Sequence, residues 1–456
     1  MSDSSASQAR SLSRRLDALP FTRKHAKLLG GSGLGWALDA MDVGLISFII
    51  AALTQHWGIT TGEAGLIASI GFAGMAIGAS LGGLLADKFG RRQIFAITLL
   101  VYGAATGASA LVGGIAALLV LRFVVGLGLG AELPVASTYV SEFAPARIRG
   151  RLIVILEAFW AVGWTAAAII GYFVVPASEN GWRWAFAIGA IPAIYAFAVR
   201  WGLPESPRWL AGRGRVAEGE RIVADFEASA GVTAPDTVAE PRLPAAAAVA
   251  VAPAAPAGSR VAGLWTREFR GRTLAIWAVW FCVNFAYYGA FIWIPSILVD
   301  AGFSLVRSFG FTLIITLAQL PGYAVAAWLI EKWGRRPTLS VFLVGSAVSA
   351  VLFGTVHTEG AIIASGMALS FFNLGAWGAL YAVTPEIYPT SLRGTGAGWA
   401  AGVGRIASIV APLLVPVMLA GAGTTFTFAV FAAFFIVAAA ATWGLVDRRG
   451  AALDDR

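Results

Sequence analysis

The sequence predicts an all-α membrane protein whose twelve helices form two parallel six-helix halves. Three observations support this fold class. The 456 residues have a mean hydropathy of +0.75, and only 13% of them are charged, which is typical of a chain that crosses a membrane many times. Long apolar stretches recur along the whole chain, and two motifs each occur twice at the same spacing.

The apolar stretches are long enough to cross a bilayer as helices. They centre on about residues 41, 75, 103, 129, 163, 193, 285, 318, 347, 373, 408 and 434. Lys and Arg concentrate in both termini and in alternate loops, whereas the other loops hold only Arg183 and Arg307. Cytoplasmic loops carry the excess of positive charge, so an even number of spans places both termini in the cytoplasm.

The spans divide the chain into five segments. A cytoplasmic tail comprises residues 1–27, and the six-helix halves comprise residues 28–203 and 273–446. Between the halves, residues 204–272 are expected to form a cytoplasmic loop with short amphipathic helices and an Ala/Pro-rich linker. A second cytoplasmic tail comprises residues 447–456.

Composition also argues against several kinds of site. Cys282 is the single cysteine, and His25, His56 and His357 are scattered, so neither disulfides nor a metal site is expected. The net charge of +8 would suggest a nucleic-acid partner in a soluble chain, but the positive-inside rule explains it here. We expect no cofactor and no enzymatic activity, because no nucleophile–base pair is visible.

Two motifs repeat, and both second copies begin 244 residues after the first. The stretch GGLLADKFGRR at 82–92 matches AAWLIEKWGRR at 326–336, and SEFAPARIRGR at 141–151 matches PEIYPTSLRGT at 385–395. Two independent matches at one spacing indicate two halves with the same orientation. Parallel repeats are related by an axis along the membrane normal, and a binding cavity is expected at their interface.

Charged and glycine residues of these motifs are predicted to form a cytoplasmic gate. Opposite charges can pair there when the cytoplasmic side is closed, and Gly83 and Gly90 would allow close helix approach and a tight turn. The candidate gate residues are Gly83, Asp87, Gly90, Arg91, Glu142, Arg149, Glu331, Arg335, Glu386 and Arg393.

The first span carries two carboxylates at its middle. At 100° per residue, Asp39 and Asp42 share one face with Trp36. An acid at the bilayer centre costs roughly 3 kcal/mol on insertion scales, so this face is expected to line a water-filled cavity or to pair with a neighbouring helix. Five charged residues within the spans have no charged counterpart in the other half, as substrate or ion recognition would require: Asp39, Asp42, Arg122, Glu132 and Arg405.

The repeated GRR motif resembles the loop between the second and third helices of the major facilitator superfamily. RFVVGLGLGAELP at 122–134 resembles that superfamily's fourth-helix pattern, and PESPRWL at 204–210 and PEIYPTSLRG at 385–394 resemble sugar-porter signatures. This resemblance implies transport by rocking of the two halves, without an ATP site.

A second resemblance lies in the first and tenth spans. The stretch GWALDAMDVGLISFIIAAL at 35–53 and the segment Asn373-Leu-Gly-Ala-Trp377 resemble bacterial niacin transporters, which are relatives of the synaptic vesicle glycoprotein 2 proteins. Aromatic-acid/proton symporters share a similar acidic first helix. The implied substrate is a small aromatic acid.

Departures from the sugar-porter pattern favour the same substrate class. The acid and the arginine of proton-linked sugar porters fall on Asp42 and Arg122, and both are kept. Where sugar porters have a glutamine that binds sugar hydroxyls, this chain has Glu157. Where they have an Asn-Trp pair in the eleventh helix, it has Gly404 and Arg405. Aromatic rings with a cation suit a flat aromatic carboxylate better than a sugar.

The resemblance and the unmatched charges together assign proton coupling to Asp39, Asp42 and Arg122. Alternatively, Asp42 and Arg122 form a permanent salt bridge, and Asp39 contacts the pyridine nitrogen of the substrate or is a solvated acid at the entrance. Arg405 is the candidate receptor for the substrate carboxylate, or it pairs with an acid between the halves. Glu157 is assigned either to the substrate site or to packing at the gate.

Further candidates for the substrate site combine amides with aromatic rings, in two cases on a single helix face. They are Asn284, Tyr287 and Tyr288 in the seventh span, Asn373, Trp377 and Tyr381 in the tenth, and Trp36, Trp164 and Gln319 elsewhere. We therefore expect a monomeric secondary transporter of the bacterial inner membrane that imports a small aromatic monocarboxylate with protons, with nicotinate as the best candidate. The alternatives are a sugar or organic-ion porter and a membrane receptor on a transporter fold.

Overall fold

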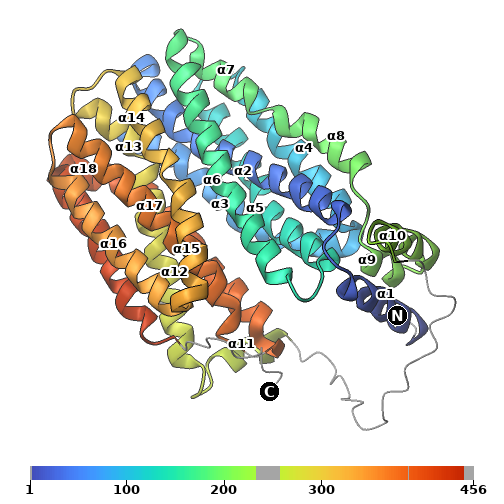
Figure 1. Ribbon diagram of the computed structural model, residues 1–456. Coiled ribbons are helices and arrows are strands. Elements are labelled where there is room, and N and C mark those ends of the chain that lie inside the picture. Colours follow the sequence, from blue (N-terminus) through green and yellow to red (C-terminus); the bar gives the residue numbers. More distant parts are fainter. Residues whose placement is uncertain (1–2, 233–256, 389, 446–456) are drawn as a thin grey trace.

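A computed structural model describes residues 3–232, 257–388 and 390–445, and all regular structure in these ranges is helical. The helices form two bundles that lie side by side, one from each half of the chain (Figure 1). The all-α fold class predicted from the sequence is therefore confirmed for the described residues.

Each bundle contains long helices, some of which are broken into two pieces. The first bundle contains α2 (Arg23–Trp57), α3 (Thr61–Phe89), α4 (Arg91–Ser109), α5 (Ile115–Phe143), α6 (Arg149–Phe173), the short η1 (Val175–Ala177), α7 (Gly181–Ile188) and α8 (Ile191–Gly202). The second contains α12 (Arg270–Phe291), α13 (Ile294–Asp300), α14 (Leu305–Leu317), α15 (Gln319–Trp333), α16 (Arg335–Thr355), α17 (Glu359–Val383), the short η2 (Thr384–Glu386) and α18 (Thr390–Thr442).

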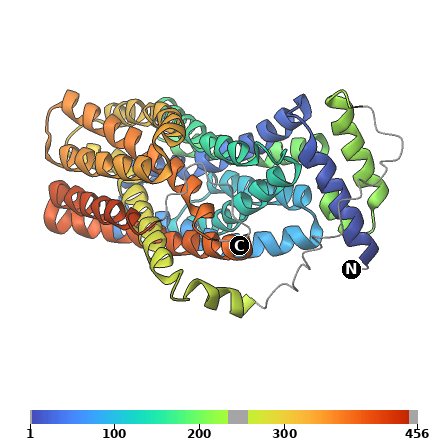
Figure 2. The same cartoon turned by 60° about the horizontal axis from the view of Figure 1, so that its bottom comes forward.

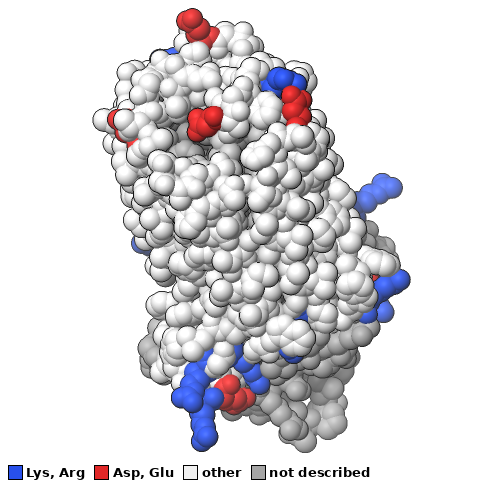
Figure 3. Space-filling model, turned by 90° about the vertical axis from the view of Figure 1, so that its left-hand side faces the viewer, with Lys and Arg blue, Asp and Glu red and all other residues white. Residues whose placement is uncertain are grey.

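Ten helical stretches in the described ranges are long and apolar enough to cross a membrane. The sequence predicts twelve spans, and two features of the helices bear on the difference. The stretch α18 joins two helices across Gly423, whose backbone (φ 77°, ψ −179°) is not helical, and the 19-residue α4 is not among the ten. In the view of Figure 3, charged side chains gather toward the two ends of the molecule, and the surface between them is nearly free of charge.

Four short helices mark one end of the molecule, which we call the loop end. The helices α1 (Asp3–Ala18), α9 (Pro207–Gly212) and α10 (Val216–Ser229) lie together beside the first bundle, as Figure 2 shows, and α11 (Ala257–Leu264) lies at the second. Arg15 of α1 binds Glu227 of α10 at 2.7 Å. The predicted linker falls mostly at 233–256 and the C-terminal tail at 447–456, and both lie outside the described residues.

Small residues bring α2 into backbone contact with α6. A Cβ atom added to Gly163 would lie 2.0 Å from the carbonyl oxygen of Ala37, and one added to Gly44 would lie 2.8 Å from the Cβ of Ala167. Such close packing of small residues is the usual way in which helices associate in a membrane. It fixes the position of α2, the helix that carries the two mid-span carboxylates.

Replacing Gly163 by alanine is expected to destabilise the fold. The added methyl group overlaps the backbone of α2, and overpacking of this kind costs about 1–3 kcal/mol. The measurement is the midpoint of thermal unfolding of the purified protein in detergent. Gly150→Ala is the matched control, because Gly150 lies in the same helix and its added methyl group would meet no packed neighbour within 4 Å. Equal midpoints for the two variants would contradict the expectation.

The two bundles contact each other closely at the end away from the loops. Phe48 of α2 packs edge-on against Phe309 of α14, with ring centroids 5.0 Å apart, and the Ser69 hydroxyl donates to the Ile409 carbonyl at 2.7 Å. At the loop end, the ion pair between Arg151 and Glu331 spans the bundles at 3.4 Å, and both side chains are mostly exposed. Packing between the bundles is therefore tightest at the end away from the loops.

Candidate functional site

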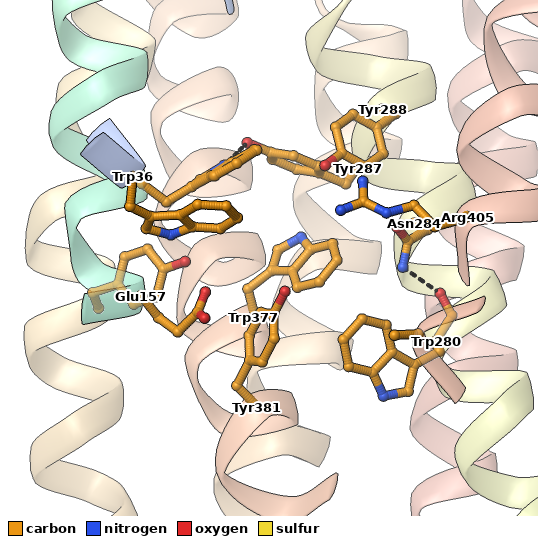
Figure 4. A pocket seen from close by; sticks show the side chains of 12 residues that line it. Trp36, Glu157, Trp280, Asn284, Tyr287, Tyr288, Trp377, Tyr381 and Arg405 are labelled. Carbon is orange, nitrogen blue, oxygen red and sulfur yellow. Dashed lines mark hydrogen bonds between the residues drawn. The ribbon is translucent and has the colours of Figure 1, made fainter. Parts of the chain in front are cut away.

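A cavity lies between the two bundles. Eight of its twelve lining residues are aromatic, and Figure 4 shows the labelled side chains facing one shared space. The lining residues are Trp36 of α2, Glu157 and Trp160 of α6, Trp280, Asn284, Tyr287 and Tyr288 of α12, Tyr323 of α15, Trp377 and Tyr381 of α17, and Ala401 and Arg405 of α18.

Contacts between aromatic rings shape the cavity and join its two walls. Trp36 packs against Trp160 with ring centroids 5.0 Å apart, and the Trp160 indole nitrogen donates to the Tyr287 hydroxyl of the other bundle at 3.1 Å. Trp377 stacks on Tyr381 at 5.7 Å and lies 5.7 Å from Tyr287. These rings offer both faces and edges to a ligand, which suits a flat aromatic molecule.

Arg405 is the one cation among the residues that line the cavity. No carboxylate in the described ranges lies within 4.0 Å of its guanidinium group. The Tyr288 hydroxyl lies beside it, and the Met75 sulfur is 4.0 Å away. An arginine that has no anion of its own is suited to bind the carboxylate of a ligand through two parallel hydrogen bonds.

Glu157 places a carboxyl group on the facing wall. It is 3% exposed, lies beside Trp36, and is separated from Arg405 by the space around Trp377 in Figure 4. The cavity therefore offers a cation on one wall, a carboxyl group on the other and aromatic rings between them.

Asn284 lines the cavity, but both ends of its amide already have hydrogen-bond partners. Its nitrogen donates to the Trp280 carbonyl at 2.7 Å, and its oxygen accepts from the Ser408 hydroxyl at 2.9 Å. The bond from Ser408 connects α18 to α12, and both bonds reduce what the amide can offer to a ligand.

Asp42 and Arg122 form a salt bridge inside the first bundle. The Arg122 guanidinium donates to Asp42 at 2.9 Å, and the Thr106 hydroxyl donates to the other carboxylate oxygen at 2.6 Å. The two charged side chains are 1% and 4% exposed, and neither lines the cavity. The pairing of these residues expected from the sequence is present in the structure.

Asp39 also lies away from the cavity. It is 1% exposed, which is inconsistent with a solvated acid at the entrance, and it is absent from the cavity lining. Its neighbours are Glu132 of α5 and Tyr102 of α4. The sequence pattern singled out Glu132 as an unmatched charge but gave no reason to place it beside Asp39.

Three further candidates from the sequence do not line the cavity. Trp164 packs behind it, with ring centroids 5.8 Å from Tyr287 and 6.2 Å from Phe291. Gln319 and Asn373 are fully buried, and their amides have no hydrogen-bond partner among the described residues.

Sequence reasoning missed four lining residues: Trp160, Trp280, Tyr323 and Ala401. For two of them a signal was available. Trp280 precedes Asn284 by four residues and so shares its helix face, and Trp160 follows Glu157 by three residues.

Comparison with known proteins identifies the family. The family described as "Sugar (and other) transporter" matches residues 29–446, nearly the whole chain. The chain belongs to this family. It is therefore a membrane transporter of the major facilitator type rather than an enzyme, and the superfamily inferred from the GRR motif is confirmed.

One similar protein is the "Niacin transporter NiaP" of Acinetobacter baylyi, which is 48% identical over 89% of this chain and 90% of that protein. The "Synaptic vesicle 2-related protein" of Bos taurus is 28% identical over 96% of this chain and 81% of that protein. The xylose transporter XylE from E. coli, in a partially occluded inward open conformation, covers 94% of this chain with a TM-score of 0.74 and 20% identity. That likeness shows the fold.

In this transporter, five of the ten candidate gate residues form ion pairs within their own bundle. Arg91 binds Asp87 at 2.7 Å and Glu142 at 3.3 Å, and Arg335 binds Glu386 at 2.7 Å. The repeat therefore places equivalent pairs at the loop end of both bundles.

Three gate residues differ from expectation or fall outside the described residues. Arg149 binds Asp17 of α1, a partner that no repeat could indicate, and the Arg393 side chain lies outside the described residues. The close helix approach expected at Gly83 is wrong, because a Cβ atom added there would meet no packed neighbour within 4 Å. Gly82 makes that approach, since its added Cβ would lie 2.6 Å from the Ala131 Cβ of α5. Gly90 forms the expected turn, with φ at 107°.

Proposed function

We propose that this transporter imports nicotinate together with protons by alternating access. The observation that carries the proposal is Arg405, a cation without a described anionic partner in a cavity lined mainly by aromatic rings. A small aromatic ring that bears one carboxylate would give Arg405 an anion to bind and would present a flat face to the aromatic rings of the lining.

The arrangement of the cavity walls suggests an orientation for nicotinate. The carboxylate would bind Arg405, and the ring would lie against Trp377 and its aromatic neighbours. The ring nitrogen would then face the wall that carries Glu157, whose carboxyl group, when protonated, can donate a hydrogen bond to that nitrogen. The name of the Acinetobacter baylyi relative supports the same substrate.

Alternating access follows from the family and from the parallel repeat. We propose twelve spans, which are obtained by counting α4 and by dividing α18 at Gly423. The loop end would face the cytoplasm, in agreement with the positive-inside rule, and the location would be a bacterial inner membrane. The two six-helix halves would then be residues 28–203 and 273–446, joined by the cytoplasmic loop 204–272 and flanked by the tails 1–27 and 447–456. The helix α2 begins earlier than the first of these boundaries, at Arg23.

Proton coupling would involve the buried carboxyl groups of the first bundle, and one monomer would contain the whole pathway. The experiment is uptake of labelled nicotinate into cells that lack their own carrier, with and without a protonophore. Uptake that the protonophore abolishes is the expected result. Uptake that persists with the protonophore would contradict proton coupling. Inhibition of transport by glucose or a quaternary amine, without inhibition by nicotinate, would contradict nicotinate as the substrate.

Trp377→Ala is expected to weaken nicotinate binding about tenfold, because a stacking aromatic ring contributes about 1.4 kcal/mol to binding. The measurement is the dissociation constant by isothermal titration calorimetry on purified protein. Trp184→Ala is the matched control, since Trp184 is 64% exposed and does not line the cavity. Equal affinities for the two variants would show that the ring binds elsewhere.

A further inference from the structure

Two carboxyl groups meet inside the first bundle, outside the cavity. Asp39 of α2 is 1% exposed and Glu132 of α5 is fully buried. The two side chains are neighbours close enough for a hydrogen bond between them. Two ionised carboxylates can only accept hydrogen bonds and repel each other in a medium of low dielectric constant. A shared proton converts one of them into a donor and removes the repulsion.

The surroundings of this pair supply no compensating charge. No Arg, Lys or His in the described ranges forms an ion pair with either carboxyl group. None of their four oxygen atoms accepts a hydrogen bond from a donor group of the described residues. Arg122 is already paired with Asp42, which lies on the same helix as Asp39.

Two tyrosines complete the surroundings. The Tyr102 hydroxyl of α4 is buried beside Asp39 and has no hydrogen-bond partner among the described residues. Tyr195 of α8 lies near Glu132, but its hydroxyl donates to the Gly31 carbonyl at 2.7 Å. Of these two tyrosines, Tyr102 is therefore the neutral donor that is free to bind the pair.

We propose that Asp39 and Glu132 form a shared proton site, and that this site, rather than the salt bridge of Asp42 and Arg122, exchanges the proton that accompanies the substrate. The inference rests on the proposed function and adds to it the residues that carry the proton. The Asp42 carboxylate already accepts hydrogen bonds from two donors and needs no proton. In contrast, Asp39 and Glu132 can form a hydrogen bond to each other only when one of them is protonated.

The pair is linked to the cavity through one turn of α2. A Cβ atom on Gly35 would lie 2.8 Å from the Glu132 carboxyl oxygen, so Glu132 presses against the α2 backbone at that point. The next residue, Trp36, lines the cavity and packs against Trp160. Loss of the proton would push Glu132 and Asp39 apart and shift this turn, and a substrate that holds Trp36 in place would favour the protonated pair.

The experiment measures nicotinate accumulation in liposomes that contain the purified protein, with the outside one pH unit more acidic than the inside. One proton per nicotinate gives about tenfold accumulation at this gradient, and protein-free liposomes correct for passive entry of the acid. Asp39→Asn and Glu132→Gln are expected to abolish accumulation but to keep exchange of labelled for unlabelled nicotinate at equal pH. Glu132→Asp should retain accumulation, and Glu179→Gln, an exposed acid, is the control.

Tenfold accumulation by both neutral variants would overturn the proposal, as would a requirement for sodium. If a variant folds but does not exchange nicotinate, the affinity for nicotinate is measured as a function of pH. An affinity that does not depend on pH supports the shared site, and a pH dependence like that of the wild type overturns it. Tyr102→Phe is a second variant that keeps both acids, and it should move the midpoint of the wild-type profile to higher pH, so an unmoved midpoint counts against the site. A wild type that neither exchanges nor accumulates nicotinate refutes the proposed function itself.

Discussion

Arg405→Ala is expected to lower kcat/KM for nicotinate uptake about 100-fold. Removing one partner of a charged, desolvated hydrogen-bonded pair costs about 2–5 kcal/mol, and about 2.8 kcal/mol corresponds to a factor of 100. The effect should be this large because Arg405 is the one cation among the residues that line the cavity. The measurement is the initial rate of labelled uptake over a range of nicotinate concentrations.

Two companion variants separate the role of the guanidinium group from that of charge alone. Arg405→Lys keeps the charge but loses the paired donors, so an intermediate rate is expected. Arg307→Ala is the matched control, because Arg307 is mostly exposed and binds Glu359 at the surface, where ion pairs contribute little. A rate for Arg405→Ala that equals the rate of this control would show that another group binds the carboxylate.

Arg122→Ala is expected to cost about 3–5 kcal/mol of stability, because it leaves the Asp42 charge buried without a cation. Thr106 would be its one remaining hydrogen-bond donor among the present partners. The measurement is the free energy of unfolding of the purified protein in detergent, followed with a chemical denaturant. The double variant Asp42→Asn with Arg122→Met should regain most of the loss, since it leaves no unpaired charge.

The control for this prediction is another arginine in an ion pair. Arg151 binds Glu331 at 3.4 Å, and its side chain is 73% exposed, so Arg151→Ala should change stability by at most about 0.5 kcal/mol. If Arg122→Ala unfolds like Arg151→Ala, then Asp42 is not held as an ion in the folded protein.

The fold could be predicted because its signals are local or repeated. The two motifs 244 residues apart indicate two parallel halves, and the family match confirms the transporter class. The pair of Asp42 and Arg122 was also predictable, because a charge inside a span needs a partner and few were available.

The neighbours of Asp39 could not be predicted in the same way. A rotation of about 60° around the helix separates Trp36 from Asp39, so the sequence assigned both to one face. Since α2 is enclosed by other helices on nearly all sides, this rotation is enough to place Trp36 in the cavity and Asp39 against α5. The same limit applies to Gln319 and Asn373, whose polar character suggested a binding role although both lie outside the cavity lining.

Equilibrium binding of nicotinate and nicotinamide to the purified protein tests the central claim most directly. The two molecules share their ring and size, and they differ in the charge that Arg405 would bind. The account predicts that nicotinate binds at least about tenfold more tightly than nicotinamide and that Arg405→Gln removes the difference. Equal affinity for the two molecules, or a preference for nicotinamide, would contradict it.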